Sequence, residues 1–145
     1  MRLTLVALAL ALAACPAPRV TIESAAHRAD RGELRAALGD YDAIAGARET
    51  STEDRVRAWT AGALVCERLR DAEGARRRLE SAVAADVAGQ SEPAMYYLGD
   101  LLREPDRARA LNLYYRAAAG AEKHRAGGFP YHAAMDRILQ LSMTR

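Results

Sequence analysis

Apolar and small residues recur three or four positions apart over most of the chain, which is the spacing of one helix face. No stretch of any length shows the alternation of a strand, and no Asn-Gly hairpin signal separates apolar runs. The pattern therefore predicts an all-α protein. The predicted helices span residues 21–30, 33–47, 53–70, 72–87, 93–103, 107–124 and 131–143.

The breaks between these helices contain helix start signals. Ser51 and Ser91 can each accept a hydrogen bond from the free amides of a first turn, and Pro93 fits just inside the turn that follows Ser91. Pro105 disfavours helical geometry in the residue before it and so ends a helix. Asp106 is then predicted to cap the next helix.

A pattern of a small residue, a bulky residue four positions later and an aliphatic residue three beyond occurs three times. The triplets are Ala37, Tyr41, Ile44; Ala75, Leu79, Ala82; and Ala110, Tyr114, Ala117. Their opening alanines are 38 and 35 residues apart, close to the roughly 34-residue period of helical hairpin repeats. In the preceding helices Trp59, Ala63 and Cys66 match Met95, Gly99 and Leu102. These stripes are predicted to form the core.

This arrangement resembles the tetratricopeptide pattern, and the last unit also looks like a Sel1-like repeat. The Sel1-like matches are Ala94, Leu98, Gly99, Asp106, Ala110, Tyr114, Tyr115, Ala117, Ala118 and Gly120. The resemblance covers about residues 21–124 and implies a short α-solenoid of about three antiparallel helical hairpins within a domain of residues 21–145. The helix predicted at 131–143 would cap the open end of that array.

The first 14 residues have the layout of a secretory signal peptide. A positive start at Arg2 precedes an apolar run from Leu3 to Leu12, about half of the roughly 20 residues that a spanning helix needs. The sequence Leu12-Ala13-Ala14-Cys15 resembles the lipobox of bacterial lipoproteins. This resemblance implies that residues 1–14 are removed and that Cys15 carries a diacylglyceryl lipid. The alternative is an ordinary signal peptide with an incidental cysteine.

Residues 15–20 would then form a lipidated tether that holds the domain close to a membrane. Residues 16–21 reach about 20 Å when fully extended. Pro16 follows the cysteine, where inner-membrane lipoproteins of enteric bacteria carry aspartate. The resemblance therefore implies a lipid anchor that faces the periplasm, in the outer membrane rather than the inner.

Charge and motifs exclude several classes of function. The 21 basic and 19 acidic residues are interspersed and give a net charge of only +2, which argues against a nucleic-acid surface. His27, His124 and His132 lack the spacing of metal ligands, and no phosphate loop or nucleophile motif is visible. His132 and Asp136 are predicted to form a surface pair. We expect no catalytic residue, no metal, and no cofactor besides the lipid on Cys15.

The resemblance implies a scaffold or adaptor of the cell envelope that binds another protein or peptide. An accessory or pilot lipoprotein for an outer-membrane assembly machine or a cell-wall enzyme is the alternative. In such arrays the first helix of each pair lines a concave face, which gives the candidate residues Arg57, Thr60, Leu64, Glu67, Arg68, Tyr96, Asp100 and Arg103. The three arginines among these candidates favour an acidic or extended partner segment.

A second candidate site is the run Arg76-Arg77-Arg78, which could meet anionic lipid or a partner. Glu73 and Glu80 lie within four residues of these arginines, so a solvated helix face is the favoured interpretation of the run.

Overall fold

The computed structural model describes residues 20–124 and 130–143, and within these ranges the chain is helical without any strand. The predicted all-α class is therefore confirmed. The predicted signal peptide, Cys15 and the tether up to residue 19 lie outside the described residues. The helices are α1 (Ile22–Asp30), α2 (Leu34–Gly46), α3 (Thr52–Arg68), α4 (Ala72–Ala85), α5 (Glu92–Leu102), α6 (Arg107–His124) and α7 (Tyr131–Met143).

Each predicted helix is present, and its ends lie within two residues of the expected positions. The Ser51 hydroxyl accepts a hydrogen bond from the Asp54 amide, and the Asp106 carboxylate accepts one from the Arg109 amide, so both predicted starts are confirmed. Helix α4 ends two residues early, because Asp86 adopts a left-handed conformation with φ at +47°.

Ser91 does not cap α5 as expected. Its hydroxyl accepts a hydrogen bond from the Val87 amide at 2.9 Å and donates one to the Ala82 carbonyl at 3.0 Å. The side chain is buried, so it satisfies backbone groups of the turn between α4 and α5 where water cannot reach them. The serine thus fixes the turn and does not cap α5.

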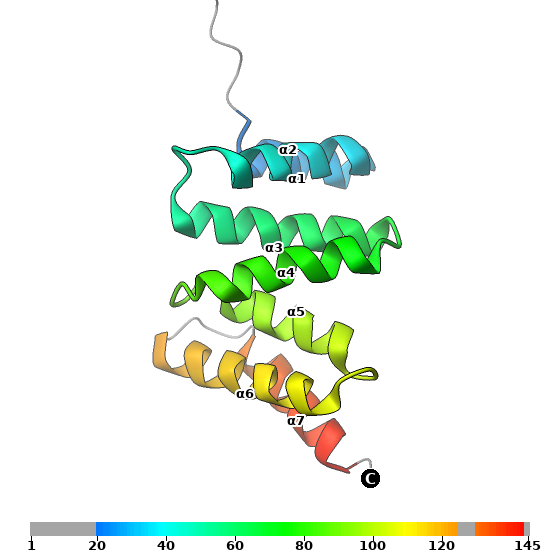
Figure 1. Cartoon of the computed structure of the whole chain (residues 1–145), viewed down its shortest axis with the longest axis vertical. Coiled ribbons are helices and arrows are strands. Elements are labelled where there is room, and N and C mark those ends of the chain that lie inside the picture. Colours follow the sequence, from blue (N-terminus) through cyan, green and yellow to red (C-terminus); the bar gives the residue numbers. More distant parts are fainter. Residues whose placement is uncertain (1–19, 125–129, 144–145) are drawn as a thin grey trace, which may run out of the picture.

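Consecutive helices pack against one another along the whole described chain, and α1 also contacts α3. Figure 1 shows the helices stacked along the long axis of the molecule, with α1 and α2 at one end and α7 at the other. Contacts are thus mainly between elements that are close in sequence, which predicts fast formation of local structure.

The buried residues form two core clusters. One, here called the N-terminal core, joins α1, α2 and α3, and the other, the C-terminal core, joins residues from α3 to α7. Leu38 of α2 and Trp59 of α3 pack against both clusters. Trp59 is half-buried, whereas the sequence pattern predicted it in the core. It therefore connects the two clusters from their edge.

The nine residues of the three repeated triplets are all buried, none more than 9% exposed. Their predicted place in the core is confirmed. In the third unit the small–large pairing is direct, because a Cβ atom added to Gly99 would lie 2.7 Å from Cε1 of Tyr114. Only glycine allows the Tyr114 ring to approach the α5 backbone this closely.

Candidate partner-binding faces

Ion pairs connect the second helices of successive predicted pairs. Arg78 of α4 reaches Asp42 of α2 at 2.6 Å, and Arg109 of α6 reaches Glu80 of α4 at 3.3 Å. Arg116 of α6 lies 3.5 Å from Asp86 just after α4. One side of the molecule is thus joined by charged contacts that run from α2 through α4 to α6.

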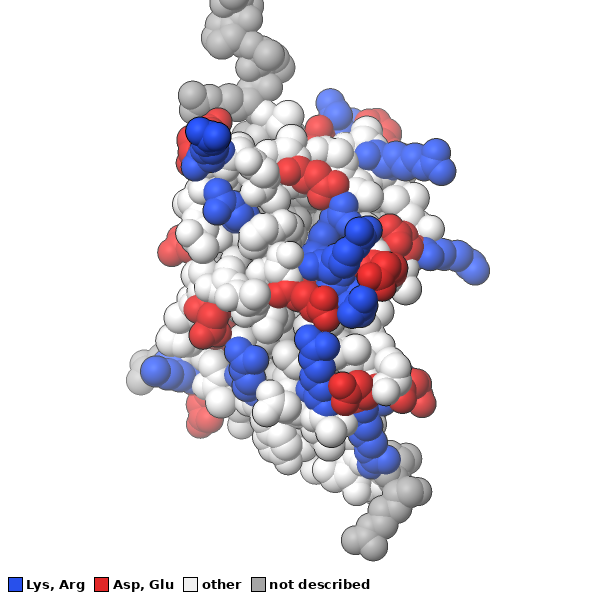
Figure 2. Space-filling model, in the orientation of Figure 1, with Lys and Arg blue, Asp and Glu red and all other residues white. Residues whose placement is uncertain are grey.

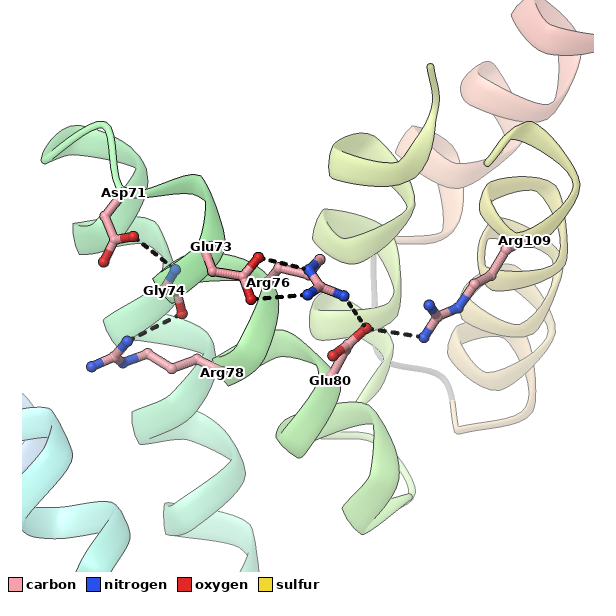
Figure 3. A network of polar contacts seen from close by, with 7 residues as sticks. All are labelled: Asp71, Glu73, Gly74, Arg76, Arg78, Glu80 and Arg109. Carbon is pink, nitrogen blue, oxygen red and sulfur yellow. Dashed lines mark hydrogen bonds and ion pairs between the residues drawn. The ribbon is translucent and has the colours of Figure 1, made fainter. Parts of the chain in front are cut away.

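The arginine run on α4 is largely used in this network (Figure 3). Arg76 binds both oxygens of Glu73 and also approaches Glu80, which in turn accepts a hydrogen bond from Arg109. Arg78 also donates a hydrogen bond to the Gly74 carbonyl at 3.1 Å, in addition to its Asp42 pair.

Arg77 differs from its two neighbours, since it is exposed and forms no ion pair with the part of the chain that the structure describes. Figure 2 shows basic and acidic side chains interleaved over the visible face of the molecule, without an extended area of one sign. A single free arginine is a weak electrostatic attractant for a membrane, where basic clusters act together.

Five of the predicted binding residues lie on α3. Arg57, Glu67 and Arg68 are exposed, and Thr60 and Leu64 are half-buried. Arg57 lies 3.0 Å from Asp54 and 3.8 Å from Glu23 of α1. The Thr60 hydroxyl donates to the Val56 carbonyl of its own helix at 2.8 Å. These residues extend along the length of α3 and leave its two ends in different surroundings.

Of the other three predicted residues, Tyr96 and Asp100 lie in α5 and Arg103 directly follows it. Tyr96 and Asp100 contact other side chains of the fold. Tyr96 is only 9% exposed, with its ring centroid 5.4 Å from that of Tyr97 and 5.8 Å from that of Tyr114. Its burial differs from the expectation of an open face, because aromatic neighbours cover it. Arg103 remains half-buried, 3.9 Å from Glu104.

Asp100 is the most heavily engaged of the predicted residues. It accepts a hydrogen bond from the Tyr114 hydroxyl at 2.7 Å and another from Arg137 Nε of α7 at 2.8 Å. Burial and the hydrogen bond to Asp100 raise the pKa of Tyr114 well above that of a free tyrosine. Helix α7 thus contributes a cation to the part of α5 that was predicted to meet a partner.

The end of α3 and the middle of α5 share one electrostatic environment. Partial burial raises the pKa of Glu67, and the negative charge of Asp100 raises it further. Burial also raises the pKa of Tyr97, and Tyr96 and then Glu67 add to that shift. Arg57 is ten residues from Glu67, about 15 Å along the helix axis, so the predicted residues do not converge on one point.

Sequence reasoning missed Arg137 and the hydroxyl of Tyr114 as partners of Asp100. The Arg137–Asp100 pair joins residues 37 positions apart, and no local spacing in the sequence predicts such a contact. The periodicity of α7 predicted one apolar face formed by Tyr131, Ala134, Met135, Ile138 and Leu139. Ala134 and Ile138 are buried as expected, whereas Leu139 is 56% exposed and Leu141 is buried. The polar contact beside that apolar face depends on how α7 crosses α5 and α6.

His27, His124 and His132 are exposed, and among residues 20–124 and 130–143 no three His, Cys, Asp or Glu side chains come together as metal ligands would. Cys66 is buried, and that burial raises the pKa of its thiol, which lowers its reactivity.

Comparisons with protein families, with curated proteins and with solved structures found no match for this chain. None of the helices in the described ranges is both long and apolar enough to cross a bilayer. What the described residues define is an all-helical fold.

Proposed function

We propose that this chain is a membrane-anchored scaffold or adaptor of the cell envelope, which binds another polypeptide through one face of a helical-repeat array. In this proposal α1 with α2, α3 with α4, and α5 with α6 form three antiparallel hairpins of a short tetratricopeptide- or Sel1-like α-solenoid. Helix α7 is the cap on the last hairpin. The proposal assigns the chain no catalytic residue.

The observation that carries the proposal is the burial of equivalent residues in three successive units. Ala37, Ala75 and Ala110 are each 0% exposed, and a bulky residue four positions later is 4% exposed or less in each unit. Repetition of one small–large contact at a near-constant period is what stacked hairpins require. It supports a repeat array as the basis of the fold.

The distribution of ion pairs supports different roles for the two sides of the array. The ion pairs Asp42–Arg78, Glu80–Arg109 and Asp86–Arg116 connect α2, α4 and α6, so many charges on this side are already paired. Helices α1 and α3 retain exposed polar side chains such as Glu67 and Arg68. We propose that the α1–α3 side is the one that meets a partner.

The location is proposed from the lipobox-like sequence that ends at Cys15. A lipid on this residue would hold the domain at a membrane, with the outer membrane favoured over the inner and the domain facing the periplasm. Two or more acyl chains anchor a protein stably, whereas one chain gives only marginal binding. The capped start of α1 at Thr21 leaves a short tether, so the partner is expected to be an envelope protein or peptide.

Photocrosslinking in intact cells tests this function. A benzoylphenylalanine residue placed at Arg68 of α3 should capture a defined neighbour, whereas the same residue at Arg77 of α4 should not. Both are exposed arginines on helices, so they form a matched pair. Capture of the same neighbour from Arg77 but not from Arg68 would contradict the proposed binding side.

A further inference from the structure

A hollow of about 730 Å³ opens at the end of the molecule where α1 and α3 begin and α2 ends. Its lining combines the start of α1, the last turn of α2, and the loop that leads into α3. The lining residues used below are Val20, Ile22, Glu23, Ile44, Glu49 and Arg57. Arg57 is the single predicted binding residue that lines it.

Apolar side chains form part of the hollow. Val20 is 41% exposed, Ile22 is half-buried, and Ile44 is 9% exposed. The alanines Ala43 and Ala47 widen the space beside them, because their side chains are short. An apolar side chain that entered here would remove exposed apolar surface from water, which favours binding.

Negative charge predominates around this apolar surface. The lining includes the carboxylates of Glu23, Glu49 and Asp54 and the guanidinium of Arg57. A second guanidinium, that of Arg55, is bonded to the carbonyls of Ala47 and Thr50 in the wall, so three carboxylates face two cations. Arg57 already pairs with Asp54 at 3.0 Å and more loosely with Glu23 at 3.8 Å. Glu49 is exposed and forms no ion pair within the described ranges.

The opposite end of the same side is less suited to a partner. Asp100 is held by Arg137 and Tyr114, and Tyr96 is buried beneath its neighbours. The hollow at the α1–α3 end, in contrast, has a volume within the usual range for a bound group and carboxylates without a full set of cations. Shape and charge therefore favour this end.

We infer that the hollow binds a polypeptide segment in which an apolar side chain is flanked by lysine or arginine. The apolar side chain packs against Val20, Ile22 and Ile44, while the cation pairs with Glu49 and shares Glu23 with Arg57. This inference rests on the proposed function and names the partner's chemistry. It differs from the acidic or extended partner segment expected from the sequence, because Arg57 is paired internally and lies among carboxylates.

Two synthetic peptides test the inference by fluorescence anisotropy with the full chain in neutral detergent. Both are fluorescein-labelled peptides of about 12 residues, at roughly 3.3 Å per residue when extended. One alternates leucine with lysine, and the other alternates leucine with glutamate. The lysine peptide should bind, and the glutamate peptide should bind at least about tenfold more weakly, since its carboxylates would be repelled by those of the hollow.

Matched charge reversals locate the binding. Glu49→Lys should weaken binding of the lysine peptide by about tenfold, because an attraction becomes a repulsion. Glu53→Lys makes the same change of net charge on an exposed residue of the first turn of α3 that does not line the hollow, and it should leave binding within about twofold. Equal effects of the two variants, or no binding of the lysine peptide to the unaltered chain, would overturn the inference.

A photocrosslinker at Thr50, which lines the hollow and is not assigned to the peptide's cation, distinguishes the remaining occupants. The expected product joins this position to the lysine peptide, and a crosslink to residues 15–19 of the same chain in place of the peptide would overturn the inference. A different result tests the proposed function. If the photocrosslinker at Arg68 captures a cellular neighbour but the lysine peptide does not bind the hollow, the scaffold proposal stands and the hollow is not its binding site.

Discussion

The ring of Tyr114 lies against the backbone of Gly99, so closely that a Cβ atom at Gly99 would stand 2.7 Å from Tyr114 Cε1. The Tyr114 hydroxyl continues past this contact and donates a hydrogen bond to Asp100, the next residue of α5. One glycine thus lets a single aromatic side chain pack against α5 and satisfy a carboxylate on it.

We expect Gly99→Ala to reduce the free energy of unfolding by about 1–3 kcal/mol through overpacking, although alanine favours helix. Tyr114→Leu in the same chain should relieve the clash, because the second unit has alanine at 63 and leucine at 79 in the equivalent positions. Urea denaturation of the single and double variants should therefore give a double-mutant cycle in which the two losses are not additive.

Gly39→Ala provides the control for this cycle. Gly39 is exposed in α2, and a Cβ atom there would meet nothing within 4 Å. Its replacement should stabilise the chain by up to about 1 kcal/mol, since only helix propensity changes. Additive losses in the cycle, or equal effects of the Gly39 and Gly99 variants, would show that the Gly99–Tyr114 contact does not limit packing.

Trp59 is expected to couple the two core clusters, because it packs against both. Trp59→Ala should cost about 2–3 kcal/mol, less than the 3–5 kcal/mol of a fully buried aromatic side chain, since the ring is half-buried. Hydrogen exchange should accelerate more in α1 and α2 than in α5 and α6, because the smaller N-terminal core loses its support. Uniform acceleration along the chain would argue against two clusters joined at Trp59.

Arg137 is expected to hold α7 on the rest of the fold. Arg137→Ala should reduce stability by about 1.5–3 kcal/mol, because the half-buried carboxylate of Asp100 loses its charged partner. The rate of hydrogen exchange in α7 should increase in the same variant. Arg103→Ala should change stability by less than about 0.5 kcal/mol, since its contact with Glu104 is long and open to solvent. Similar losses for both variants would contradict the assigned role of Arg137.

Tyr114 should make stability sensitive to alkaline pH. Burial and its hydrogen bond to Asp100 raise its pKa, so the folded chain favours the neutral phenol more than the unfolded chain does. This stabilisation is complete below about pH 10, the value of an unperturbed tyrosine, and is lost as pH rises through the folded pKa. The free energy of unfolding should therefore fall with pH above about 10.

Two phenylalanine variants test this assignment by denaturation at several alkaline pH values. Tyr114→Phe should fall less steeply with pH than the unaltered chain, because it has no phenol to ionise at this position. Tyr115 is 56% exposed, and Tyr115→Phe should keep the slope of the unaltered chain. An unchanged slope in the Tyr114 variant would mean that other groups govern the alkaline limit.

The sequence was sufficient to predict the helices and the buried triplets on α2, α4 and α6. Small residues such as Ala75 and Ala110 recur at a period that a stack of helices explains, and periodicity along one helix determines which of its residues face inward. Helix ends shifted slightly where a single residue such as Asp86 adopted a left-handed conformation.

The candidate binding face was less predictable, because it depends on contacts between distant helices. Asp100 looked available in α5, yet Arg137 reaches it from 37 residues away. Tyr96 looked like a surface residue, yet Tyr97 and Tyr114 cover it. The hollow beside Glu49 has no local sequence signal either, because it forms where the starts of α1 and α3 meet the end of α2.

The proposed function depends most on the lipid anchor at Cys15, because without it the domain would not be held at a membrane. Cells that make the full chain should be given an alkyne-labelled fatty acid, and the protein should then be recovered and its intact mass measured. We predict that the unaltered chain takes up the label and begins at Cys15, and that Cys15→Ser remains unlabelled and uncleaved. A Cys15→Ser chain that is still labelled, or an unaltered chain that is cleaved without any lipid, would contradict the anchor and with it the proposed place of action.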